Sequence, residues 1–271
     1  MTEHMPRELA DFYPEEIEDH DEASLAKLFD DFYVEARRLQ KAYVEQIQLF
    51  VGFEGEWIRP GGSLELIKGV LEKHSVDLFV GSVHHVYTVP IDFDLALYHK
   101  ARDMGDGTDE RIFADYFDSQ YEMLQALKPP VVAHFDLIRL KSDDPERSFR
   151  TWPKIWEKIE RNLEFIASYG GIVELNSSSL RKGMSEPYPQ VEICKVRPFN
   201  PTCIYELPFV RSAKRHHSIS SPFLAASPSQ TTATVSSKSA STTTACWKPS
   251  RKPASKNSPT WLLRALPTLF L

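Results

Sequence analysis

Hydrophobic residues along this chain fall into two alternating patterns, helical stripes and short unbroken runs. From Asp21 to Gln46 the apolar positions lie three and four residues apart, which predicts an amphipathic helix. The same reasoning predicts strands over 47–53, 76–83, 131–133 and 172–175, and helices over 64–73, 109–127 and 152–169. We expect Gly61, Gly62 and Ser63 to end the preceding segment and to lie directly before the helix over 64–73. Short strands alternating with amphipathic helices predict an α/β fold with a parallel sheet, either a barrel or an open sheet.

The pattern ends near residue 195, where the charge also changes sign. Residues 1–195 hold 22 Lys or Arg against 37 Asp or Glu, a net charge of −15, whereas residues 196–271 hold 10 against one, a net charge of +9. Prolines interrupt the helix that residues 189–195 begin. In 212–260, 20 of 49 residues are Ser or Thr, a composition that cannot bury a core. We therefore expect a folded domain over residues 1–195 and a mostly disordered basic tail over residues 196–271.

Composition also limits the compartment and the partners of the chain. Three cysteines, Cys194, Cys203 and Cys246, are too few and too far apart for a disulfide framework, which favours a reducing compartment. No apolar run approaches the ~20 residues of a membrane span, and the first residues lack the apolar core of a signal peptide. We expect a cytoplasmic protein that binds no membrane, and the sequence leaves its oligomeric state open.

Histidine and carboxylate side chains recur at the ends of the predicted strands. His4 lies near the start of the chain, and Glu54, His84, His134 and Glu174 each lie at or just after an apolar run. Because active sites of parallel sheets lie at the carboxyl ends of the strands, we expect these side chains to converge. Imidazole and carboxylate suit zinc, iron and manganese, and several such ions could polarise a phosphoryl group. The pattern therefore predicts a multinuclear divalent-metal site.

Some polar residues leave two interpretations open. Glu56 alternates with Glu54 along a strand, so it could face the site or belong to a solvated acidic surface. Arg181, after a Ser-rich segment, could form an anion-binding loop or an ordinary exposed one. Three isolated histidines are more typical of hydrogen-bonded structural residues than of ligands: His20, His74 and His99.

Five short segments, taken together, match the motifs of a known family. They are Thr-Glu-His-Met-Pro-Arg at 2–7, Gly-Phe-Glu at 52–54, Gly-Ser-Val-His-His at 81–85, Ala-His-Phe-Asp at 133–136 and Glu-Leu-Asn-Ser-Ser-Ser-Leu-Arg-Lys-Gly at 174–183. With these motifs the chain resembles histidinol-phosphate phosphatases of the polymerase-and-histidinol-phosphatase (PHP) superfamily, particularly fungal forms. The resemblance covers about residues 1–195. It implies a distorted (β/α)7 barrel, a trinuclear metal centre, and hydrolysis of L-histidinol phosphate to L-histidinol and phosphate in histidine biosynthesis.

The resemblance also assigns roles to individual residues. It implies that zinc, manganese or iron is held by four metal ligands: His4, Glu54, His84 and His134. It implies that Arg181, and less directly Arg139, contacts the phosphate of the substrate. The partner is then a small-molecule phosphate monoester, and not nucleic acid, whose phosphate backbone the −15 charge would repel.

Two motifs of the family are missing from this chain. A His-x-His pair should precede the Thr-Glu-His segment, and an Asp-x-His should follow the helix begun at 189–195, but no Asp follows Asp144. Since four ligands cannot hold three ions, we expect the family's catalytic activity to be impaired here. Two other hypotheses are a non-catalytic metal-binding remnant and another PHP phosphoesterase. The break at Val196 is expected from a retained intron or a shifted reading frame, with a genuine tail as the alternative, and Met1 is expected to be an internal methionine used as a start.

Overall fold

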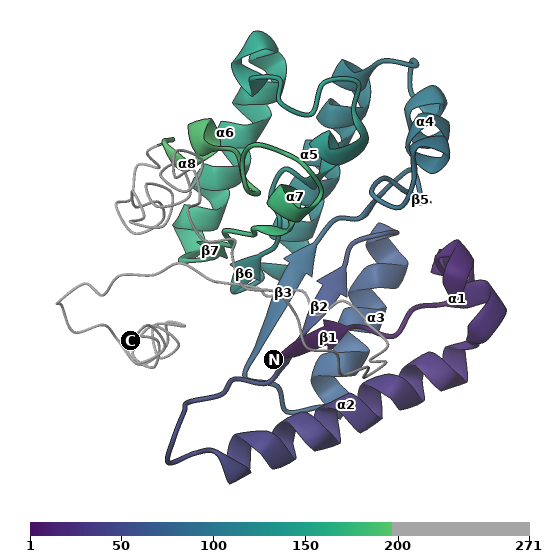
Figure 1. Ribbon diagram of the computed structural model, residues 1–271, viewed down its shortest axis with the longest axis vertical. Helices are drawn as coiled ribbons and strands as arrows, with labels where there is room; N and C mark the ends of the chain where they lie inside the picture. The colour runs from purple at the N-terminus through teal and green to yellow at the C-terminus, as the bar shows by residue number, and fades with distance from the viewer. Residues whose placement is uncertain (197–271) are drawn as a thin grey trace, which may run out of the picture.

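A parallel β-sheet forms the centre of the molecule in the computed structural model, which describes residues 1–196 (Figure 1). The strands lie in the order β1-β2-β3-β6-β7, and every neighbouring pair is parallel. Their bounds are β1 Thr2–His4, β2 Gly52–Glu56, β3 Leu78–Ser82, β6 Val131–Val132 and β7 Ile172–Val173. An antiparallel hairpin of β4 (His85–Val86) and β5 (Val89–Pro90) follows β3. The predicted α/β class with a parallel sheet is confirmed.

Helices connect the strands and cover the sheet. The α-helices are α1 Pro14–Asp19, α2 Glu22–Ala42, α3 Pro60–Lys73, α4 Leu95–Met104, α5 Asp109–Leu127, α6 Pro153–Tyr169, α7 Ser178–Arg181 and α8 Val191–Cys194. Single turns of 3₁₀ helix occur at η1 Leu9–Asp11, η2 Leu137–Lys141 and η3 Phe149–Thr151. The long predicted helices are therefore present, with ends that shift by at most a few residues except at α2, which stops at Ala42, and α3, which starts at Pro60.

The register of the sheet brings the carboxyl ends of its strands together. His4 pairs with Glu54, Glu54 pairs with Val80, and Val80 pairs with Val131. Each following segment therefore leaves the sheet along the same edge. That edge is where side chains from distant parts of the sequence can meet.

The larger apolar core lies around α5 and α6, which pack against each other. Thr108 caps α5 by accepting a hydrogen bond from the Arg111 backbone at 3.2 Å, and Gly170 ends α6 with a left-handed φ of 79°. Both helices place apolar residues toward β3, β6 and β7 and leave charged residues outside. This layer forms the upper part of the molecule in Figure 1.

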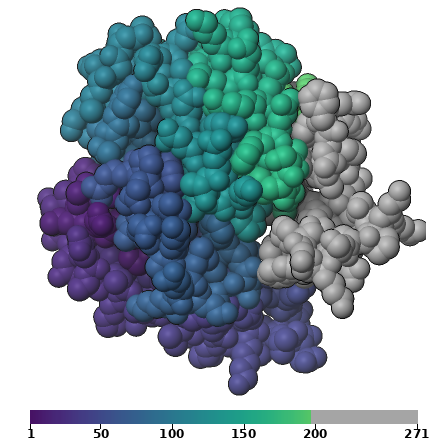
Figure 2. All heavy atoms as spheres, turned by 180° about the vertical axis from the view of Figure 1, so that it is seen from behind, coloured from purple at the N-terminus to yellow at the C-terminus, as the bar shows by residue number. Residues whose placement is uncertain are grey.

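A smaller core joins α2 and α3 to β1 and β2. Phe29, Phe53 and Ile67 are its buried centre, together with Met5 and Val70. Seen from behind, the purple and dark blue N-terminal segments form the lower part of the surface, and the teal and green segments form the upper part (Figure 2). The molecule thus has two packed regions that share one sheet.

Besides the end of α2, two predicted boundaries are wrong. The strand predicted over 47–53 starts only at Gly52, because the residues after α2 form an exposed loop, with Ile47 47% exposed. The helix predicted from Leu64 starts at Pro60, so the two glycines and Ser63 lie in its first turn rather than before it. Proline suits the first position of a helix, and the Ser63 hydroxyl accepts the Ile58 backbone N–H at 2.8 Å.

Helices α1 and α4 and the β4-β5 hairpin were not predicted; α1 has six residues and each hairpin strand has two, too few for a recognisable period, while α4 has ten. None of the helices within residues 1–196 is both long and apolar enough to cross a membrane. The predicted disordered segment, 212–260, lies outside the described residues.

Candidate metal centre

The four residues predicted as ligands converge at the carboxyl edge of the sheet. His4 ends β1, Glu54 lies in β2, His84 comes two residues after β3, and His134 comes two residues after β6. The Nε2 atoms of His84 and His134 are 2.9 Å apart. Glu54 Oε1 lies 3.1 Å from His134 Nε2 and 3.4 Å from His84 Nε2. The sequence therefore located these side chains correctly, although they come from four separate segments.

The three atoms nearest one another fit the corners of a metal coordination sphere. Zinc bonds of about 2.0–2.1 Å in a tetrahedron separate neighbouring ligand atoms by about 3.3 Å. The Glu54, His84 and His134 atoms form a triangle with sides of 2.9, 3.1 and 3.4 Å. One of these two nitrogens can donate a hydrogen bond to the other, and when both are unprotonated their lone pairs, with the Glu54 oxygen, can instead bind one shared cation. The residues present therefore fit a divalent metal ion.

Glu56 is hydrogen-bonded to His4 and lies within ion-pair distance of His84. His4 Nδ1 is 2.8 Å from Glu56 Oε1, and His84 Nδ1 is 3.5 Å from Glu56 Oε2. Arg7 also donates to Glu56 Oε1, and Glu56 is fully buried. The interpretation of Glu56 as part of a solvated surface is therefore wrong. Alternation along the strand predicted which way the Glu56 side chain points. Only the fold shows that α1 and the loop before α1 cover this side chain.

A carboxylate on the second nitrogen of an imidazole leaves the first nitrogen free to bind a metal ion. His84 directs Nδ1 to Glu56 and Nε2 to the triangle, and His4 directs Nδ1 to Glu56. Such partners set the tautomer and the orientation of ligand histidines in metal sites. His4, Glu56 and His84 form a second group whose donor atoms lie within 4.8 Å of one another.

The charges in this cluster are strongly coupled. Burial alone would raise the pKa of Glu54, but the hydrogen bond from His134 and the charges of His84, His134 and His4 hold it well below its usual value. Burial opposes protonation of His84, yet contact with Glu56 and the charges of Asp92, Glu56 and Glu54 raise its pKa to about 9. The carboxylates are thus ionised, and His84 carries a proton at neutral pH when no cation is bound.

The neighbouring histidine, His85, behaves differently. Burial lowers the pKa of His85 to about 4, and its ring lies 5.4 Å from the Tyr13 ring. It is therefore a neutral imidazole at neutral pH, and it packs beside the cluster rather than within the triangle.

A buried carboxylate also fixes the position of His134. The backbone N–H of His134 donates to Glu174 Oε2 at 2.9 Å, and the Asn176 side-chain amide donates to the same oxygen at 3.2 Å. His134 has a φ of 20°, which is rare outside glycine. The strand-end position of Glu174 was noticed in the sequence, but its contact is with the backbone of a candidate ligand.

The two arginines expected at the phosphate lie in different environments. Arg139 is 1% exposed; its Nε donates to Asp136 Oδ2 at 3.0 Å, and its Nη atoms donate to three backbone carbonyls. Its guanidinium thus holds two loops together and does not face the triangle. Arg181 ends α7 and is exposed, with its neighbour Lys182. The expectation for Arg139 is therefore corrected, whereas Arg181 keeps a position from which it could meet an anion.

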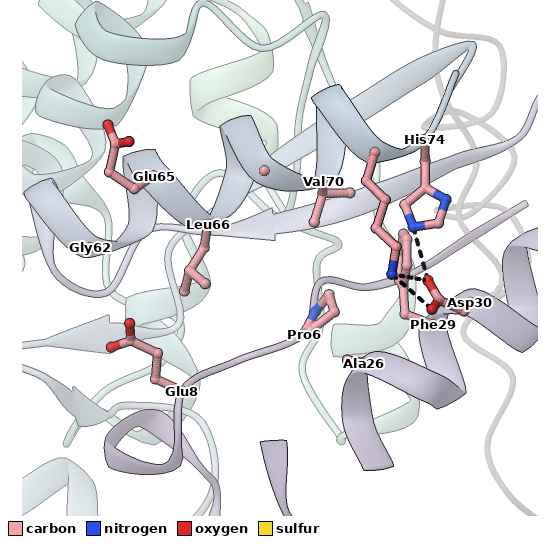
Figure 3. Close-up of a pocket in the computed structure, with 12 residues that line it drawn as sticks. Pro6, Glu8, Ala26, Phe29, Asp30, Gly62, Glu65, Leu66, Val70 and His74 are labelled. Carbon is pink, nitrogen blue, oxygen red and sulfur yellow. Dashed lines mark hydrogen bonds and ion pairs between the residues drawn. The ribbon is translucent and has the colours of Figure 1, made fainter. Parts of the chain in front are cut away.

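A separate groove of about 390 Å³ lies between α2 and α3, outside the cluster (Figure 3). Phe29, Leu66 and Val70 give it an apolar floor. The acidic and basic side chains along it are paired: Asp30 binds Lys73 at 2.8 Å and His74 at 3.0 Å. His74 thus has the structural role that the sequence favoured.

Known proteins match the part of the chain that contains the candidate ligands. The PHP domain model matches residues 1–178. The chain is 45% identical over 198 residues to a Schizosaccharomyces pombe protein named "Probable histidinol-phosphatase", covering 72% of this chain and 64% of that protein. It is 35% identical over 228 residues to a Saccharomyces cerevisiae protein named histidinol-phosphatase, covering 72% of this chain and 68% of that protein. The chain thus spans less than two thirds of the S. pombe relative.

A solved structure agrees in fold. A Listeria monocytogenes chain, provisionally assigned as a histidinol phosphatase, superposes with a TM-score of 0.55 at 18% identity. The match covers 71% of this chain and 75% of that one. At this identity the likeness concerns the arrangement of strands and helices alone.

Proposed function

This chain belongs to the PHP domain family, and from that premise we propose that it hydrolyses L-histidinol phosphate to L-histidinol and phosphate. Two fungal relatives, 45% identical over 198 residues and 35% identical over 228 residues, carry the name of this activity. The matched segment, residues 1–178, contains all four candidate ligands. Sequence relationship and donor geometry therefore support the same reaction class.

The observation that carries the proposal is the triangle of Glu54, His84 and His134. Its donors are two imidazoles and one carboxylate, a set that suits zinc, manganese or iron. When bound, such ions polarise a phosphoryl group and make water a better nucleophile at neutral pH. Glu54, His84 and His134 would hold one ion, and His4, grouped with Glu56 and His84, would contribute to a second.

The other residues of the site position these ligands. Glu56 orients His4 and His84 through their Nδ1 atoms, and Glu174 holds the backbone of His134. Arg181 would contact the phosphate of the substrate from the end of α7. Its guanidinium makes no ion pair with the described residues, so it can bind an anion without breaking an existing contact.

The test uses the full chain, stripped with a chelator and reloaded separately with Mn²⁺, Zn²⁺ and Fe²⁺. Phosphate release is then measured from L-histidinol phosphate and from two other monoesters, glycerol phosphate and a short oligonucleotide with a terminal phosphate. We expect metal-dependent release with preference for L-histidinol phosphate.

Each other outcome has a definite meaning. Metal binding without phosphate release from any ester would contradict hydrolysis and favour a metal-binding remnant. Faster release from another ester would overturn the substrate and favour another PHP phosphoesterase.

A further inference from the structure

Asp92 lies beside the candidate metal centre but is not among its ligands. It comes two residues after β5, and the preceding residue, Ile91, donates its backbone N–H to the His84 carbonyl oxygen at 2.9 Å. The ring of Tyr13 lies 5.4 Å from the ring of His85 and 6.0 Å from that of Phe93. The hairpin thus holds Asp92 next to the segment that carries His84.

The Asp92 carboxylate has no partner within residues 1–196. Its Oδ1 is buried and accepts no hydrogen bond, while the side chain as a whole is half-buried and makes no ion pair with the described residues. Buried carboxylates in folded proteins are normally paired with a cation or with hydrogen-bond donors, because an unpaired one loses its hydration without compensation. By comparison, Asp94, two residues later, accepts the Leu97 backbone N–H at 2.7 Å as the cap of α4.

The charge of Asp92 also acts on the basic side chain of Lys182. Burial lowers the pKa of Lys182, and Asp92 opposes that shift while Lys141 and Arg181 add to it. Lys182 nevertheless makes no ion pair with Asp92, so this lysine does not neutralise the carboxylate by direct contact.

We propose that Asp92 forms a subsite for the protonated primary amine of the substrate. The inference rests on the proposed function. In L-histidinol phosphate the amine is attached to the carbon next to the one that bears the ester oxygen. A phosphate at the metal centre therefore brings an ammonium group to the neighbourhood of His84, where Asp92 is unpaired. An ammonium supplies three donors to a carboxylate that has none, and a charge-assisted hydrogen bond is among the strongest available.

The first test compares Asp92→Asn with the matched variant Asp94→Asn. The substrates are L-histidinol phosphate and its analogue without the amine, 3-(imidazol-4-yl)propyl phosphate. In the unaltered protein and in Asp94→Asn, kcat/KM should favour the amine-bearing compound. In Asp92→Asn this ratio should fall at least tenfold, which corresponds to about 1.4 kcal/mol. A ratio that stays the same would overturn the proposal, and so would a loss of bound metal in Asp92→Asn.

The second test needs no turnover. L-histidinol binding to the metal-loaded full chain is measured by calorimetry, with 3-(imidazol-4-yl)propanol as the compound without the amine. We expect Asp92→Asn to weaken L-histidinol binding at least tenfold and to leave the thermal midpoint of the ligand-free protein equal or higher, because the substitution removes the charge of a carboxylate whose buried oxygen has no partner. A lower midpoint would show a structural role and overturn the subsite, as would absence of L-histidinol binding.

The two tests separate the two proposals. If the chain releases no phosphate but binds L-histidinol through Asp92, the proposed reaction fails while the amine subsite stands. If it hydrolyses L-histidinol phosphate and Asp92→Asn keeps the preference for the amine, the reaction stands while the subsite fails.

Discussion

Two residues of one short segment enter buried polar clusters of different kinds. His134, just after β6, meets His84 and Glu54 at 2.9 and 3.1 Å. Asp136, two positions later, meets Arg139, and its Oδ2 also accepts the Gln190 backbone N–H at 2.9 Å. In the second cluster the chain itself supplies the cation. In the first, two imidazole nitrogens and a carboxylate oxygen face a common point at which the chain supplies none.

This difference separates a structural cluster from a candidate site. Arg139 donates to Asp136 and to carbonyl oxygens of three residues, so its charge and its hydrogen-bonding groups are used internally. Buried charges of this kind stabilise only as a complete set. Under the proposed function, an external cation would complete the triangle of Glu54, His84 and His134, and this cluster should respond to metal rather than to loss of an arginine.

The largest expected effect is on stability, from Arg139→Met. The substitution keeps the volume roughly but leaves Asp136 buried without its cation, which typically costs about 3–5 kcal/mol. Urea denaturation of the chelated protein measures the free energy of unfolding. The metal affinity of the molecules that remain folded should stay close to that of the unaltered chain.

Arg161→Met is the control for that measurement. Arg161 pairs with Asp118 at 3.0 Å, but both side chains are about a third or more exposed, so the pair contributes about 0–1 kcal/mol. Equal losses in the two variants would contradict the structural role assigned to Arg139.

The next effect concerns His134→Ala, which removes one corner of the triangle. We expect phosphate release to fall more than a hundredfold, about 2.7 kcal/mol in the barrier, together with metal content. His74→Ala is the control, because His74 is also a buried histidine paired with a carboxylate, Asp30, but lies in the groove between α2 and α3. If both variants kept their metal and activity alike, the triangle would not be the metal site.

The sequence predicted the positions of some residues of the candidate metal centre better than those of others. The convergence of His4, Glu54, His84 and His134 follows from one rule, that parallel strands present their carboxyl ends at one edge. Glu56 stayed ambiguous because alternation along a strand gives the direction of a side chain but not what covers it. The role of Arg139 was misjudged, since the turn of 3₁₀ helix that directs it inward leaves no periodic signal.

In the fold, too, elements without a periodic sequence pattern could not be predicted. Helices α5 and α6 were predicted almost to the residue because 17 or more positions repeat one period. The strands of the β4-β5 hairpin are two residues long and carry no period, so the position of Asp92 beside His84 could not be inferred. Short elements are set by their neighbours in space.

The next expected effect is opposite pH dependence in the metal-free and metal-loaded forms. The pKa of His84 is raised from 6.5 to about 9, against burial, by Glu56, Asp92 and Glu54, while His4 and His134 also border its ring. A raised folded-state pKa gives stability that is present below pH 6.5 and is lost as the pH rises to about 9. The loss in metal-free protein should reach at most about 3 kcal/mol.

Metal should reverse this slope, because a ligand imidazole must be deprotonated and its affinity for the ion rises with pH. Thermal melts from pH 6.5 to 9, with chelator or with excess Mn²⁺, measure both forms. Parallel curves for the two forms would contradict a metal ion at His84.

The smallest effect expected is that of Glu56→Gln, which tests whether Glu56 acts through the histidines. Loss of a carboxylate behind ligand imidazoles typically weakens metal binding about 10- to 100-fold. The same substitution also removes a partner of Arg7, so part of any change in stability reflects that buried cation. Glu16→Gln separates the two effects, because Glu16 also binds Arg7 but touches neither His4 nor His84. Titration of the folded protein with Mn²⁺ should therefore show weaker binding in Glu56→Gln alone; equal weakening in both variants would assign the effect to Arg7 and remove Glu56 from the metal site.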